Sequence, residues 1–152
     1  MSERLTSEWT DTTEEAYGAP GKKGRIGELF MKKVFESWGW AVEDCEEDRS
    51  IQTKGIDLYF KAPTWHNTYS CNVKNNMSKY GSFFVYADWL FNPNYINHRY
   101  FHVNPDTGWV AWYGTKEMKT WYKANARGSD YIIITPSDSP KFISRRLAKV
   151  EA

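Results

Sequence analysis

The sequence predicts a single α/β domain in which helices pack against a mixed sheet. Three observations predict this class: apolar residues recur at helical spacing after Gly24, several short strand patterns follow, and helical and strand patterns alternate towards the C-terminus. The chain has 152 residues, of which 41% are hydrophobic and 26% charged, as is usual for one globular domain. We expect an acidic arm and a basic loop at 1–23, followed by the domain at 24–152.

The first expected element is a helix of about four turns, which begins after Gly24 and ends before Gly39. The residues on its apolar face are Ile26, Leu29, Phe30, Val34, Phe35 and Trp38. Short strands are expected next at 40–42, 55–60 and 69–75, with loops between them.

The second half of the chain alternates between strands and helices. Residues 83–90 fit a buried strand or a short helix, and we favour the strand. The segments 99–103 and 109–114 flank the turn NPDTG and predict a hairpin. The remaining expected elements are a helix at 115–127 with Thr115 as its N-cap, a buried strand at 130–136, and a helix at 139–150 with Ser139 as its N-cap and Pro140 at its first position.

Composition excludes several classes of protein. No apolar run is long enough to span a membrane, and the N-terminal stretch MSERLTSEWTDTTEE is acidic and polar. We therefore expect a cytoplasmic protein without a secretory signal. Cys45 and Cys71 are too few for a disulfide framework, and their spacing from His98 and His102 matches no compact zinc module.

The charges of the chain are segregated along the sequence. The net charge is only +1, but acidic residues gather in 1–19 and in the run EDCEED at 43–48, which leaves the rest of the chain strongly basic. Such segregation suits a protein that meets a polyanion with one surface and a metal ion or solvent with another. Aromatic residues make up 17% of the chain, and we assign most of them to core and sheet packing.

Polar side chains are expected to share one face of two neighbouring strands. Alternation places Asp57 on the polar face of 55–60, and it places Asn72 and Lys74 on the polar face of 69–75. If the two strands pair through the short loop between them, a carboxylate, an amide and an ammonium group converge. This grouping suits phosphodiester hydrolysis, in which a carboxylate and backbone carbonyls hold Mg²⁺ and a lysine orients the attacking water.

These residues resemble the PD-(D/E)XK nuclease superfamily, which contains restriction enzymes and Holliday-junction resolvases. The resemblance covers residues 24–76 and consists of the helix GRIGELFMKKVFESWGW with Glu28, the segment GID with Asp57, and the segment NVK with Asn72 and Lys74. It implies a restriction-endonuclease-like core, with a mixed central β-sheet flanked by α-helices.

The resemblance also implies an activity. It implies a metal-dependent deoxyribonuclease that hydrolyses DNA phosphodiester bonds as an endonuclease, with structure-specific or junction-resolving action and a homodimer left open. By this resemblance Asp57, Asn72, the Val73 carbonyl and Glu28 hold Mg²⁺, for which Mn²⁺ can substitute, and Lys74 orients water. Asn72 departs from the family pattern, in which an acid stands at this position, and the loss of a negative charge weakens the expected metal site.

Polar residues around this expected site are candidates for contact with DNA phosphates. The segment GKKGR at 21–25 is expected to be a loop that enters a helix N-terminus, where backbone N–H groups favour anions. A second polar segment follows the strand at 69–75, where the chain leaves the expected site. The candidate residues are Lys22, Lys23, Arg25, Asn75, Asn76 and Lys79.

Two other functions stay open at this stage. One is a DNA-binding protein that keeps the nuclease fold but has lost catalysis through Asn72. The other is a protein-binding or inhibitory module that uses its acidic arm. The acidic run at 43–48 could also lend the carboxylate that is missing at position 72.

Overall fold

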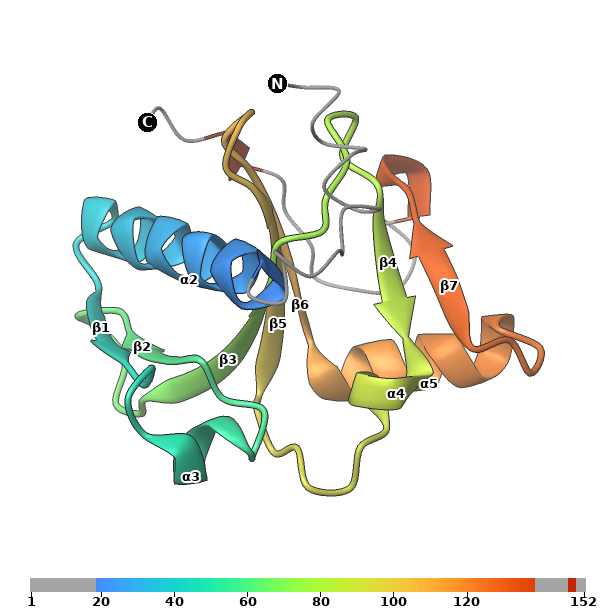
Figure 1. The fold of residues 1–152 in the computed structure, drawn as a ribbon, viewed down its shortest axis with the longest axis horizontal. Helices are drawn as coiled ribbons and strands as arrows, with labels where there is room; N and C mark the ends of the chain where they lie inside the picture. Colours follow the sequence, from blue (N-terminus) through green and yellow to red (C-terminus); the bar gives the residue numbers. More distant parts are fainter. Residues whose placement is uncertain (1–18, 139–147, 150–152) are drawn as a thin grey trace.

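A six-stranded mixed sheet forms the centre of the protein, in the order β1-β2-β3-β5-β6-β8, and strands β4 and β7 form a separate two-stranded ribbon (Figure 1). The computed structural model describes residues 19–138 and 148–149. The strands are β1 (Ala41–Asp44), β2 (Leu58–Lys61), β3 (Tyr69–Lys74), β4 (Phe83–Tyr86), β5 (Arg99–Asn104), β6 (Trp109–Gly114), β7 (Tyr131–Ile134) and β8 (Ala148–Lys149). The helices are α2 (Ala19–Ser37), α3 (Arg49–Gln52), α4 (Ala87–Leu90) and α5 (Thr115–Asn125), with a 3₁₀ turn at Pro136–Asp138.

The sheet is mixed because one of its pairings is parallel. Strands β1, β2 and β3 pair antiparallel, β3 pairs parallel with β5, and β5 pairs antiparallel with β6. A parallel pair requires a crossover, and the crossover between β3 and β5 contains β4 and α4. The mixed sheet flanked by helices confirms the predicted fold class, and the predicted β5–β6 hairpin is also confirmed.

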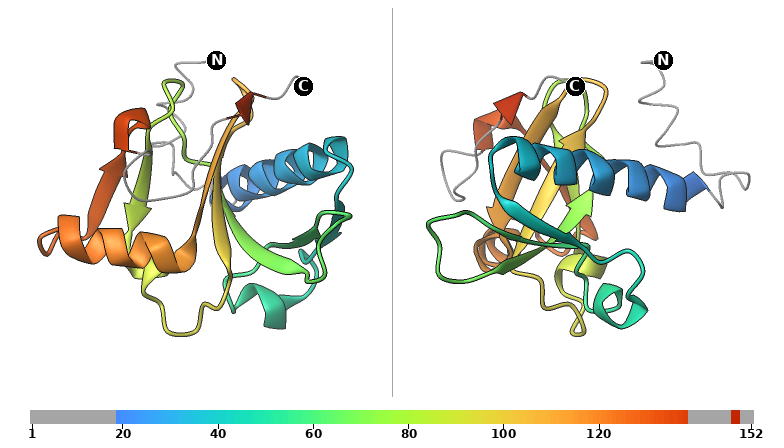
Figure 2. Two further views of the ribbon diagram at one scale, coloured as in Figure 1. Left: turned by 180° about the vertical axis from the view of Figure 1, so that it is seen from behind. Right: turned by 90° about the vertical axis from the view of Figure 1, so that its left-hand side faces the viewer.

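Helix α2 and the β4–β7 ribbon lie on opposite sides of the central strands, as Figures 1 and 2 show from three directions. On the α2 side, Met31, Val34 and Phe35 of the helix are buried in a core cluster with residues of β2, β3 and β5. Phe35 stacks on Phe60 of β2 at a centroid distance of 4.7 Å. The helix therefore rests on the strands that carry the predicted site.

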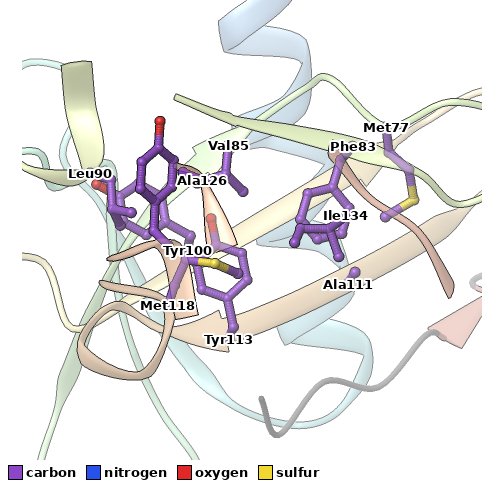
Figure 3. Close-up of a cluster of buried hydrophobic side chains, with 11 residues drawn as sticks. Met77, Phe83, Val85, Leu90, Tyr100, Ala111, Tyr113, Met118, Ala126 and Ile134 are labelled. Carbon is purple, nitrogen blue, oxygen red and sulfur yellow. The ribbon is translucent and has the colours of Figure 1, made fainter. Parts of the chain in front are cut away.

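The second core cluster fills the space between the sheet and the β4–β7 ribbon (Figure 3). Tyr100 and Tyr113 extend from β5 and β6 and are fully buried. They meet Phe83 and Val85 of β4, Ile134 of β7 and Met118 of α5. Both faces of the central strands are thus covered, which explains why β5 is almost entirely buried along its length.

The contact between α2 and β3 depends on Gly27. A Cβ atom at this position would lie 2.9 Å from Cβ of Asn75 and 3.4 Å from Cγ2 of Val103. The Asn75 amide donates a hydrogen bond to the carbonyl of Lys23 at 3.0 Å, which fastens the start of the helix to the end of β3. The close approach at Gly27 therefore fixes the position of its neighbour Glu28 relative to the sheet.

Gly27→Ala is expected to lower the free energy of unfolding by about 1 to 3 kcal/mol, because the added methyl group overpacks this contact. Helix propensity acts in the opposite direction, since alanine is favoured over glycine by about 1 kcal/mol. Gly24→Ala in the same helix is the matched control, because its Cβ atom would meet nothing within 4 Å. Urea unfolding measures both variants, and equal stabilisation of the two would contradict the close approach.

Several element predictions were wrong in detail. Helix α2 begins at Ala19, so the expected loop at 21–25 is helical. Residues 83–90 form both a strand and a short helix, because the chain turns after Tyr86. The N-cap of α5 is Gly114, and the hydroxyl of Thr115 instead donates to the carbonyl of Asn97 at 3.0 Å.

The C-terminal predictions also need correction. Strand β7 was predicted to be buried, but it belongs to a two-stranded ribbon with one face on the core, so Tyr131 and Ile133 are 44% and 49% exposed. Ala148 and Lys149 were expected in a helix, but they form β8 and pair with β6. The rest of that predicted helix, including Ser139 and Pro140, lies outside the described residues. No helix in the described part of the chain is long and apolar enough to cross a membrane.

Candidate functional site

The predicted polar residues lie where β2 and β3 begin to separate. Leu58 is paired with Cys71, and both are buried on the α2 side of the sheet. Alternation along β3 therefore turns Asn72 and Lys74 away from α2, as the sequence predicted. Asp57 directly precedes β2, and its N–H donates to the carbonyl of Cys71 at 2.8 Å.

The Asp57 carboxylate is held by the backbone of β3. Its Oδ2 atom accepts a hydrogen bond from the N–H group of Val73 at 2.7 Å. Burial raises the pKa of Asp57, although the Val73 hydrogen bond and the charge of Lys74 act in the opposite direction. The side chain of Asp57 thus adds a hydrogen bond between the two strands beyond their last backbone pair, and this bond fixes its orientation.

Glu28 reaches this carboxylate from α2. The Glu28 carboxyl group lies close enough to Asp57 for the two groups to shift each other's pKa, and its side chain is only 16% exposed. Burial and the negative charge of Asp57 raise the pKa of Glu28 to about 7. Two carboxyl groups from different elements therefore repel each other as anions, and a bound cation would relieve this repulsion.

A pH titration of the stability of the metal-free protein should reveal the raised pKa of Glu28. Because folding raises the pKa of Glu28, the native state binds more protons than the unfolded state between about pH 4.5 and pH 7. The free energy of unfolding should fall across this range as pH rises, by roughly 2 to 3 kcal/mol. Glu28→Gln should remove most of this slope, whereas Glu36→Gln, at an exposed position of α2, should retain it. Urea unfolding from pH 4 to pH 8 measures the slope.

Arg25 joins the site to the acidic run. Its guanidinium group donates two hydrogen bonds to the carboxylate of Asp44, at 2.9 and 2.7 Å, and one to Oε1 of Glu28 at 3.0 Å. A further contact of 3.3 Å links it to Glu46. The hydrogen bond from Arg25 lowers the pKa of Asp44. Arg25 thus fixes β1 and the following acidic residues beside Glu28, and its role as a DNA contact stays a prediction.

The two carboxyl groups open into a pocket of about 570 Å³. Its lining residues are Arg25, Glu28, Glu46, Glu47, Arg49, Gln52 and Asp57. Arg49 and Gln52, which belong to the short helix α3, were not predicted from the sequence. A signal was present, because Asp48 caps this helix by accepting a hydrogen bond from the N–H of Ile51. Glu46 and Glu47 of the acidic run thus line the same pocket as Asp57. This position is required if the acidic run is to supply the carboxylate that is missing at position 72.

Asn72 has a buried amide with one unpartnered atom. The side chain is 5% exposed, and its Nδ2 donates to the carbonyl of Gly55 at 2.9 Å. No group among the described residues hydrogen-bonds to its Oδ1. Gly55 has φ +78° and lies against Tyr95, so the carbonyl that orients Asn72 is itself rigidly placed. An unpaired buried oxygen costs about 1 to 3 kcal/mol, so a water or a cation that contacted Oδ1 would be stabilising.

Lys74 lies over an aromatic ring. None of the ion pairs among the described residues involves it, and its Nζ lies 4.6 Å from the ring centroid of Trp89. Burial lowers the pKa of Lys74 to about 8, and the negative charge of Asp57 partly offsets this shift.

The residues predicted to contact DNA have different environments. Lys22 and Lys79 are exposed, and Nζ of Lys79 lies 5.3 Å from the ring centroid of Tyr80. The Nδ2 atom of Asn76 donates a hydrogen bond to the carbonyl of Phe84 at 3.1 Å, and its Oδ1 atom accepts one from Nδ1 of His102 at 2.6 Å. The side-chain amide of Asn75 donates its hydrogen bond to the carbonyl of Lys23. Their assignment to DNA binding stays a prediction.

The donor set fits a hard cation. Among the described residues, no three side chains of the His, Cys, Asp or Glu type are grouped to hold a metal ion. However, Mg²⁺ commonly binds proteins through one or two carboxylates and keeps several waters. The neighbouring carboxyl groups of Asp57 and Glu28 match this requirement.

No known family model and no curated protein matches the sequence. The fold, however, is similar to that of a bacterial homing endonuclease, I-Ssp6803I, with a TM-score of 0.50 and 13% sequence identity. The match covers 81% of this chain and 82% of the endonuclease chain. The chain has a nuclease-like fold. At this level of identity the likeness concerns the fold alone, so the nuclease-like fold expected from the sequence is confirmed without any assignment of site residues.

Proposed function

We propose that the protein is a metal-dependent endonuclease of the PD-(D/E)XK type, which hydrolyses DNA phosphodiester bonds. One observation carries the proposal: the Asp57 and Glu28 carboxyl groups lie together in an open pocket, with the charge of Lys74 close enough to act on Asp57. The nuclease-like fold supports it. Paired carboxylates beside a lysine are the groups that phosphodiester hydrolysis requires.

In this proposal Mg²⁺, or Mn²⁺ in its place, is held by Asp57, Glu28, Oδ1 of Asn72 and the carbonyl of Val73. When bound, the ion supplies Lewis-acid chemistry at the phosphate and lowers the pKa of a bound water. Glu28, whose pKa is raised to about 7, would bind the ion as an anion, as would Asp57. Val73 keeps the Asp57 carboxylate in place through its N–H group.

Lys74 acts on the attacking water and on the phosphate. Its ammonium donates hydrogen bonds to the water and to a phosphate oxygen, and its charge offsets the negative charge that develops on those oxygens. Exposed Lys22 and Lys79 contact DNA phosphates in this proposal, with Lys23, Arg25, Asn75 and Asn76 nearer the site. A homodimer would bring one such site to each strand of a duplex, or to the arms of a junction.

The test is incubation of the purified protein with branched, single-stranded and duplex DNA, with Mg²⁺, with Mn²⁺ and with EDTA. We expect cleavage of at least one substrate with either metal and none with EDTA. DNA binding without metal should weaken steeply with salt, because phosphate contacts release counterions.

A second function is favoured by Asn72 and by the lack of a three-acid cluster among the described residues. It is a DNA-binding protein that keeps the fold without catalysis. Salt-dependent binding to DNA, with no cleavage under any metal condition, would select this function and reject the first. A protein that neither binds nor cleaves DNA would favour the protein-binding alternative.

A further inference from the structure

Lys74 occupies an unusual position for a partly buried cation. Its Nζ lies over the ring of Trp89, at 4.6 Å from the centroid, and Asp57 acts on it without a direct ion pair. A cation in such a place gains most from contact with a carboxylate, which the neighbouring Asp57 could supply. The ring of Trp89 therefore competes with Asp57 for the ammonium group.

Trp89 is itself held in place from two sides. It lies on α4, which the crossover between β3 and β5 brings next to the sheet. Its ring is 4.7 Å from the ring of Tyr100, and the Tyr100 hydroxyl donates to its carbonyl at 3.2 Å. Its ring is also 6.1 Å from His102, the residue of β5 that is paired with Lys74. The ring face therefore has a fixed position relative to the strand that carries Lys74.

An aromatic face and a carboxylate differ in how many N–H donors of a bound ammonium group they occupy. A ring attracts a cation through its quadrupole but accepts no strong hydrogen bond from it. An ammonium group has three N–H donors. Over a ring, the N–H donors that point away from the ring face stay available to other acceptors, whereas a carboxylate would take up one or two donors in strong hydrogen bonds.

We propose that Trp89 is a positioning residue that holds the Lys74 ammonium apart from Asp57, with its N–H donors directed to a water and a substrate phosphate. This inference rests on the function proposed above, in which Lys74 orients the attacking water. A purely structural role is the alternative, because Trp89 also packs against the core cluster beneath the β4–β7 ribbon. Such a role would require bulk at this position but no aromatic face.

Proton NMR of the metal-free protein tests the geometry without reference to activity. Protons over the face of an indole ring are shifted upfield, so the ε-methylene protons of Lys74 should resonate upfield of the other lysines. The resonances of Lys74 are identified as those that disappear from the spectrum of Lys74→Arg. The shift should decrease in Trp89→Phe and vanish in Trp89→Leu. Trp121→Leu, a variant of α5 at the same core cluster, should leave it unchanged. Ordinary Lys74 resonances in the natural protein would overturn the inference.

Cleavage assays with Mg²⁺ test the consequence. Trp89→Leu should lower kcat by roughly 10- to 100-fold with little change in KM for DNA, because misplacement of one reacting group has an effect of this size. Trp89→Phe should recover much of the loss. If Trp89→Leu kept the natural kcat, or if Trp121→Leu lost as much activity at equal stability, the positioning role would be rejected. A natural protein that cuts no DNA, with the upfield shift present, would reject the proposed function and keep the Lys74–Trp89 geometry.

Discussion

Asp57→Asn and Lys74→Met are each expected to lower the rate of DNA cleavage by roughly a thousandfold or more, because each removes a charge that stabilises the transition state. The fold should survive both changes. Asparagine at position 57 can still accept the hydrogen bond from Val73, and methionine at position 74 still packs against Trp89. We expect the free energy of unfolding to change by no more than about 2 kcal/mol in either variant.

Single-turnover cleavage with saturating Mg²⁺, together with urea unfolding, measures these two effects. The matched controls are Asp88→Asn and Lys116→Met, which alter exposed residues of α4 and α5 and should leave cleavage unchanged. Cutting at the natural rate by a folded Asp57→Asn or Lys74→Met protein would remove the proposed site.

The largest expected change in metal affinity comes from Asn72→Asp. A carboxylate here would stand near Asp57 and add a negative charge to the donor set, and attraction between unit charges about 4 Å apart is worth roughly 4 kcal/mol near a protein surface. Part of this gain offsets the desolvation of the new charge. We therefore expect at least a tenfold lower Mg²⁺ concentration for half-maximal cleavage, or the appearance of cleavage if the natural protein is silent.

Without metal the same substitution should be costly. The Nδ2 donor to Gly55 is lost and a negative charge is buried, so the free energy of unfolding should fall by about 2 to 5 kcal/mol. Asn104→Asp is the matched control, because Asn104 is also a buried strand asparagine whose amide donates to a backbone carbonyl, that of Met77. It should lose less stability than Asn72→Asp, because its Oδ1 keeps the hydrogen bonds from the N–H groups of Asp106 and Thr107, and metal affinity should not change.

Calorimetric titration with Mg²⁺ and with Mn²⁺ distinguishes the possible outcomes. A new carboxylate that paired with Lys74 would bind neither ion more tightly and would lower cleavage. If Asn72→Asp left metal affinity and cleavage unchanged in a folded protein, the side chain at position 72 would not be a metal ligand, and its role would be the hydrogen bond to Gly55. The metal ligands would then be the acidic residues that line the pocket.

The sequence could predict the parts of the site that depend on strand geometry. Side chains alternate across a strand whatever the surroundings, so the residue pattern alone was enough to assign Asn72 and Lys74 to one face of β3. The buried residues Cys71 and Val73 confirm this alternation. Glu28 was placed by resemblance alone, and its position in the structure depends on the close contact at Gly27.

The ion pairs of the site could not be predicted in this way. Arg25 and Asp44 lie on different elements, and only the packing of α2 beside β1 brings them together. The glycines and lysines of 21–25 favoured a loop, because glycine is a poor helix former. Packing of α2 against β3 outweighs this local preference, so the helix extends back to Ala19, with Pro20 in its first turn where proline is tolerated.

The C-terminal segment illustrates the same limit. Its apolar spacing favoured a helix, but the outer edge of β6 offers unpaired backbone groups, and Ala148 and Lys149 pair with this edge. A neighbouring strand edge cannot be inferred from the periodicity of the segment itself.

The parallel pairing of β3 with β5 also has a consequence for the order of folding. It joins residues far apart in the chain, such as Cys71 and Arg99, which are 28 positions apart. The β5–β6 hairpin and the individual turns of α2 are made of contacts that are local in the chain, and such elements form within microseconds, although α2 needs its packing on β3 to reach its full length. Non-local pairings form later, because chain entropy must be lost before their contacts are made. We expect Lys74 to meet Trp89 only when the crossover docks, so that a chain arrested before this step has its helix and hairpin but no assembled cluster of charges.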